Sequence, residues 1–167
     1  YALSANTSGN YNLAIGYRAM AGTGTGDYNS AYGFDALRSL TSGASNIGIG
    51  KDAGDQITEG SNNIIIGNNA HASAIDVSNE IVIGPGANGL GANYAVIGSA
   101  DVTRVYAAQD AGATLYAGGL NIGGTAVSST AAELNYVDGV TSNVQTQINA
   151  ISSSADINGG AIDGTTI

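Results

Sequence analysis

The stretch "NIGIGKDA" (46–53) is one of four related segments, the others being "NLAIGYRA" (12–19), "NSAYGFDA" (29–36) and "NIIIGNNA" (63–70). Each begins with Asn, has Gly four residues later and has Ala three residues after that Gly. The segments start seventeen residues apart, and Gly84 and Ala87 continue two of the three positions. The chain is therefore built on a seventeen-residue repeat.

A sixth copy, "GANYAVIG" (91–98), shows that the repeat can shorten. Its Gly98 follows Gly84 by only fourteen residues, and the shortening falls between Ala87 and Gly91. The basic unit is thus fourteen residues with an optional loop. The glycine column of the repeat is Gly16, Gly33, Gly50, Gly67, Gly84 and Gly98, and the asparagine column is Asn12, Asn29, Asn46 and Asn63.

A period this short, with about five strand-forming residues per copy, predicts a mainly β protein in which each copy is one coil of a parallel β-solenoid. Apolar residues alternate within a copy, as Leu13 and Ile15 or Ile47 and Ile49 do, and we expect them to form the inward face. The residues between them, such as Gly48, are small or β-branched. We therefore expect the other face to be covered as well, by a second strand of the coil or by a neighbouring subunit.

Stacking explains why the same residues recur at fixed positions of the repeat. Equivalent residues of parallel coils lie about 4.8 Å apart. Each Gly would then occupy a corner that needs a positive φ, and each Asn amide could bond to the turn backbone and to the next Asn. The alanine column would stay small because the coils close tightly there. Loop residues between ordinary strands would not keep so constant a spacing.

Composition excludes several functions. The 167 residues include only four Lys and Arg and carry a formal net charge of −9, so we expect no nucleic-acid partner and no anionic lipid surface. Without cysteine there is no disulfide framework. The longest apolar runs are far shorter than the roughly 20 residues that cross a bilayer, so we expect no membrane insertion.

The repeats also carry a family resemblance. "NLAIGYRAM" and "NIGIGKDAG" resemble the head repeats of trimeric autotransporter adhesins. Over about residues 2–98, that resemblance implies a left-handed parallel β-roll that associates as a homotrimer. The seventeen-residue coils depart from the fourteen-residue repeat of that family by the loop insertion.

Two downstream segments, 120–150 and 155–167, are similar to segments common in bacteriophage tail fibres. Together the resemblances imply part of a virion tail fibre that carries or forms the surface contacting the host cell. Its partner would be a host glycan or protein. The alternatives are a bacterial adhesin on the cell surface and a fragment of a polysaccharide depolymerase.

We expect four regions along the chain: β-roll repeats over 1–98, a small β module over 99–130, a helical neck over 131–153 and the start of a further β element over 154–167. Ala2 lies seventeen residues before Ala19. The chain is thus expected to begin within a repeat and to be an excerpt of something longer.

The neck prediction rests on the pattern "TAAE" (130–133), which has the form of a capping box. Val137, Val144, Ile148 and Ile151 follow at the spacing of a short a/d seam. Such a seam favours a coiled coil of three helices, one from each chain, over one of two helices. The alternative is a single helix that packs on its own subunit.

No catalytic constellation is found, so we expect a protein that is not an enzyme and that has no cofactor. His71 is the one histidine, and we expect it to be structural and not a metal ligand. The acidic residues lack the spacing of a calcium-binding repeat, and we interpret them as solvated surface. They are Asp27, Asp35, Asp52, Asp55, Asp76 and Glu80.

Aromatic residues give the candidate binding site. Tyr11 and Tyr28 are one period apart, as are Tyr17 and Phe34, so each pair should stack. These rings could contact a glycan. They could equally stabilise the stack or fill a trimer interface.

Overall fold

The computed structural model describes residues 1–105, 120–123, 125–128, 156–157 and 160–161. The chain divides into two units, Tyr1–Ala113 and Thr114–Ile167. The first unit contains the repeats, and no helix occurs in the described part of either unit.

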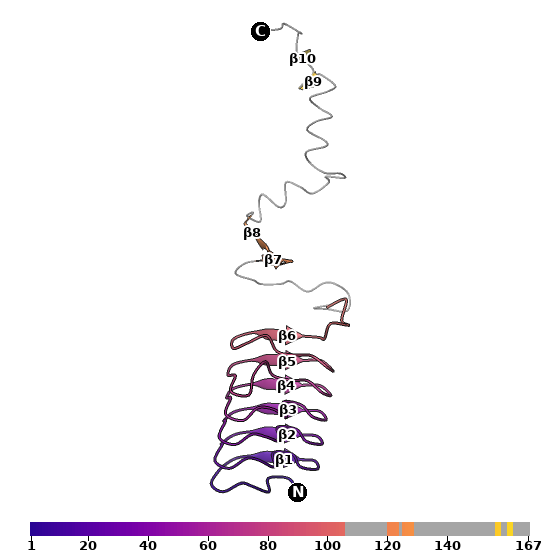
Figure 1. Cartoon of the computed structure of the whole chain (residues 1–167). Coiled ribbons are helices and arrows are strands. Elements are labelled where there is room, and N and C mark those ends of the chain that lie inside the picture. Colours follow the sequence, from indigo (N-terminus) through magenta and orange to yellow (C-terminus); the bar gives the residue numbers. More distant parts are fainter. Residues whose placement is uncertain (106–119, 124, 129–155, 158–159, 162–167) are drawn as a thin grey trace. The chain divides into compact units, whose positions relative to one another are not determined.

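Six three-residue strands form one parallel sheet in which each strand lies beside the next one in the chain (Figure 1). Ile47 pairs with Ile64, seventeen residues later, whereas Ile81 pairs with Ala95, fourteen residues later. This register confirms the parallel β-solenoid, its seventeen-residue coil and the shorter last coil. The strands are β1 (Leu13–Ile15), β2 (Ser30–Tyr32), β3 (Ile47–Ile49), β4 (Ile64–Ile66), β5 (Ile81–Ile83) and β6 (Ala95–Ile97).

The face of each strand that points into the coil is the opposite of the expected one. Leu13 is 56% exposed and Ile15 is 49% exposed, while the middle residues of β2 to β5 are buried. The prediction that the paired apolar residues point inward is therefore wrong. Alternation of side chains separates the two faces of a strand without showing which face is inside. The interior of each coil has room for only the middle side chain of each three-residue strand. At Gly48 even a Cβ would be only 2.7 Å from the Leu37 side chain.

The core is a set of columns that continue from coil to coil. The alanine column is fully buried at Ala19, Ala36, Ala53, Ala70 and Ala87, as predicted from its constant small size. Larger side chains fill the rest of each coil. The largest buried apolar ones are Met20, Leu37, Leu40, Ile57, Ile65 and Val82.

Hydrogen bonds between the asparagines link successive coils. Asn46 Oδ1 accepts from the backbone N–H and the side-chain amide of Asn63, both at 3.0 Å. Asn46 Nδ2 donates to the carbonyl of Gly60 at 2.8 Å. Asn12, Asn29 and Asn63 use their amides in the same way. We call this column the asparagine ladder, and it confirms the predicted bonding to both the corner backbone and the neighbouring asparagine.

The glycine column is confirmed as well, for two physical reasons. All six glycines have positive φ, between 95° and 145°. In addition, a Cβ on Gly33 would overlap the carbonyl of Gly50, and a Cβ on Gly50 would meet Gly67 in the same way. The corner therefore requires glycine both for its conformation and for the close approach of the next coil.

The residue before each asparagine position has a left-handed backbone, which the repeat spacing does not predict. In coil order the column is Tyr11, Tyr28, Ser45, Asn62, Asn79 and Asn93, with φ between 58° and 68°. Asn tolerates this conformation well, whereas Tyr adopts it less readily. Tyr11 and Tyr28 thus occupy a position better suited to Asn.

The second unit contains two antiparallel pairs in its described residues. β7 (Leu120–Ile122) pairs with β8 (Thr125–Val127), inside the region predicted as a small β module. β9 (Asp156–Ile157) pairs with β10 (Gly160–Ala161), inside the region predicted as a further β element. The predicted helical neck over 131–153 lies outside the described residues.

Candidate interaction surface

The outward side of the six-stranded sheet carries a continuous apolar surface. Its most exposed row is formed by the third residue of each strand, which we call the outer row. Exposure along it is 60% at Tyr32 and 37% at Ile83, and Ile66 between them is half-buried. The outer row is Ile15, Tyr32, Ile49, Ile66, Ile83 and Ile97. Contiguous apolar surface of this kind marks an interaction site more often than isolated exposed residues do.

Exposed aromatic rings flank the first two strands. The rings of Tyr11 and Tyr28 are stacked with centroids 5.0 Å apart, and those of Tyr17 and Phe34 are stacked at 5.2 Å. Both predicted pairs therefore form. The Arg18 guanidinium lies 5.4 Å from the centroid of the Tyr17 ring. All four stacked rings remain exposed to solvent, from 44% at Phe34 to 78% at Tyr11.

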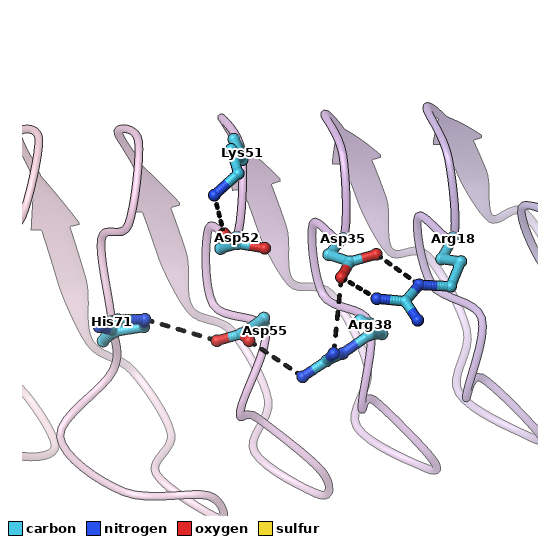
Figure 2. Close-up of polar contacts among 7 residues, drawn as sticks. All are labelled: Arg18, Asp35, Arg38, Lys51, Asp52, Asp55 and His71. Atoms are coloured by element: carbon cyan, nitrogen blue, oxygen red, sulfur yellow. Dashed lines mark hydrogen bonds and ion pairs between the residues drawn. The ribbon is translucent and has the colours of Figure 1, made fainter.

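A chain of ion pairs runs along the corner after the strands (Figure 2). Arg18 binds both carboxylate oxygens of Asp35, and Arg38 lies 3.5 Å from the same carboxylate. Arg38 also reaches Asp55 at 3.2 Å, and Asp55 Oδ1 lies 3.5 Å from His71 Nε2. We call these five residues the ion-pair ladder, which links four successive coils.

Asp35 is the central anion of the ion-pair ladder, with a side chain only 4% exposed. The hydrogen bonds from Arg18 lower the pKa of Asp35, against the opposing effect of burial. The same hydrogen bonds raise the pKa of Arg18. The buried carboxylate is therefore held in its charged form, and it ties together the first two coils.

Two of the acidic residues expected on solvated surface are buried, and that interpretation is wrong for Asp35 and Glu80. Asp35 is balanced by its two arginines. Glu80 accepts hydrogen bonds from Ser73 and Gly91 instead. Both could have been found in the repeat frame, because Asp35 follows Arg18 by one period and Glu80 follows Asn63 by one period.

His71 lies at the far end of the ion-pair ladder and is partly exposed. Among residues 1–105 and the short described segments beyond them, no group of three or more His, Cys, Asp or Glu could hold a metal ion. The same part of the chain has no helix long and apolar enough to cross a membrane.

No protein-family model, curated protein or solved structure matches this chain significantly.

Proposed function

We propose that this chain is a segment of a homotrimeric fibre of a phage tail, which displays a surface that attaches the virion to its host cell. The observation that carries the proposal is the outer row, because every strand of the sheet presents an apolar side chain away from its own core. A second and third copy of the chain would cover these side chains.

The energetics favour association through this face. Full burial of one isoleucine contributes about 1.5–3 kcal/mol, and outer-row residues that are already half covered would contribute about half of that each. Repeated over the coils of three chains, this gain can offset the roughly 4–15 kcal/mol that association costs in lost freedom. A solenoid that repeats one exposed row is thus well suited to a stiff assembly of several chains.

The choice of a virion fibre rests on the resemblance of 120–150 and 155–167 to tail-fibre segments. Host attachment fits such a rod because three chains would present three copies of each site, which raises the avidity for a cell surface without new contacts. The proposed contact is a host glycan at Tyr11, Tyr17, Tyr28 and Phe34, whose exposed rings combine an apolar body with, in the tyrosines, a hydroxyl group.

Light scattering on the purified chain tests the trimer. We expect three times the 16.4 kDa of one chain. The double change Ile49→Glu with Ile83→Glu places charges on the outer row and should give a folded single chain. Ile75→Glu is the matched control, since Ile75 is 57% exposed on the connection between β4 and β5. A mass of one or two chains for the unchanged protein would refute the trimer.

Binding to an immobilised panel of bacterial surface polysaccharides tests the glycan contact. Tyr11→Asn with Tyr28→Asn introduces the residue that the column holds at Asn62 and Asn79, so the coil should remain folded. We expect the tyrosine variant to bind at least tenfold more weakly than the unchanged chain. Ser45→Asn, in the same column, should bind normally. Equal binding by all three proteins would exclude these tyrosines as the contact.

A further inference from the structure

Glu80 occupies the position of the asparagine ladder in the fifth coil. Its backbone N–H donates to Asn63 Oδ1 at 2.9 Å, as the backbone N–H of Asn63 donates to Asn46. On this side the ladder continues without change. The coil that begins at Glu80 is the one that contains fourteen residues instead of seventeen.

On its other side Glu80 reverses the polarity of the ladder. Each asparagine amide donates to a corner carbonyl fourteen residues later, and for Asn63 the acceptor is Val77 at 2.7 Å. The Glu80 carboxylate has no proton to donate when charged, and it accepts from the backbone N–H of Gly91 at 2.8 Å. Gly91 lies seven residues before Gly98, as Gly60 lies seven before Gly67, so it is the same corner of the coil.

The remaining contacts of the carboxylate also come from donors. Ser73 donates to Oε2 from its backbone N–H at 2.9 Å and from its hydroxyl at 3.3 Å. A Cβ on Gly89 would overlap the carboxylate, so the shortened connection passes close beside it. A fully buried carboxylate needs such donors, and a corner carbonyl aimed at it would repel it.

We propose that Glu80 is a coil-length selector: an amide at this position requires the seventeen-residue coil, and a carboxylate requires the fourteen-residue coil. The longer connection presents a carbonyl to the ladder, whereas the shorter one presents an N–H. The side chain at one ladder position thereby determines how the following corner is built, independently of any partner of the chain.

A double-mutant cycle tests this assignment. The first change is Glu80→Asn. The second replaces the three residues 88–90 by the six residues 54–59, which restores a seventeen-residue coil with a sequence taken from the same chain. Thermal unfolding of the four proteins is followed by circular dichroism at one protein concentration.

We expect each single change to lower the melting temperature by roughly 5–15 °C. Glu80→Asn alone places a donor amide against the N–H of Gly91, and the longer connection alone places a carbonyl against the carboxylate of Glu80. The combined variant should melt higher than the less stable of the two single variants. If a single variant does not fold, recovery of a cooperative transition in the combined variant supports the proposal. Additive losses, or a combined variant no more stable than the worse single one, would overturn it.

Discussion

Removing one rung from the centre of the asparagine ladder should be costly, and Asn46→Ala is the sharpest test. Asn46 is completely buried. Its loss leaves the backbone N–H of Asn63 and the carbonyl of Gly60 without their partners. The amide of Asn63 keeps its bond to Val77, so two groups are affected and not three.

Each buried polar group that loses its partner costs about 1–3 kcal/mol, so Asn46→Ala should lower the free energy of unfolding by about 2–6 kcal/mol. Asn12→Ala removes the equivalent bonds from a half-buried position, where water can replace part of them. Its cost should be at most half as large.

Equilibrium unfolding in urea, at one protein concentration because self-association would add to stability, measures both values. Ser45→Asn is a suitable control, since it introduces the residue found at Asn62 and Asn79 of the same column. An Asn46→Ala variant within 1 kcal/mol (about the value of one ordinary hydrogen bond) of the unchanged chain would refute the reasoning, as would equal losses at Asn46 and Asn12.

Three further outcomes are expected from the packing and the charges. Gly50→Ala should lower the free energy of unfolding by more than about 2 kcal/mol, because its Cβ would meet the backbone of Gly67. Gly86→Ala has open space around its Cβ and should lower it by only about 1 kcal/mol, because of the positive φ. Urea unfolding of the two variants measures the difference. Thr23→Val should raise the free energy of unfolding by about 1 kcal/mol, since the buried Thr23 hydroxyl has no hydrogen-bond partner and Leu40 and Ile57 follow it at intervals of one period. Because the pKa of Asp35 is lowered in the folded state, its stabilisation is complete above the ordinary value of 3.8 and is lost as the pH falls through the lower folded pKa. Unfolding measured between pH 5 and pH 2 should therefore show a shallower loss for Asp35→Asn than for the unchanged chain.

The sequence was sufficient to predict the solenoid because its columns have physical causes that act at single positions. Gly50 is required by a positive φ and a close carbonyl, and Asn46 by partners in the next coil. Such requirements recur at every coil, so they appear in the sequence as a fixed spacing. The shorter last coil was predicted from the same frame.

The inward face was predicted wrongly because hydrophobicity does not distinguish a core from an interaction surface. Ile49 and Ile83 are as apolar as core residues, yet they lie on the outside. The small residue Gly48 between Ile47 and Ile49 was the better indication, since a narrow interior admits one side chain per strand. The ion-pair ladder does not follow from the number or sign of single charges, but the repeat frame contains it, because Arg18 and Asp35 are one period apart.

The constant positions of the asparagine and glycine columns determine how a solenoid of this kind can change in length over evolution. Deleting one whole coil, for example 46–62, would place Asn63 directly above Asn29 and Gly67 above Gly33, so the asparagine and glycine columns would stay in register. Deleting a single residue would displace all the columns beyond it. Gene rearrangements that add or remove complete units should therefore be tolerated, and related rods can differ in reach while presenting the same chemistry along their sides.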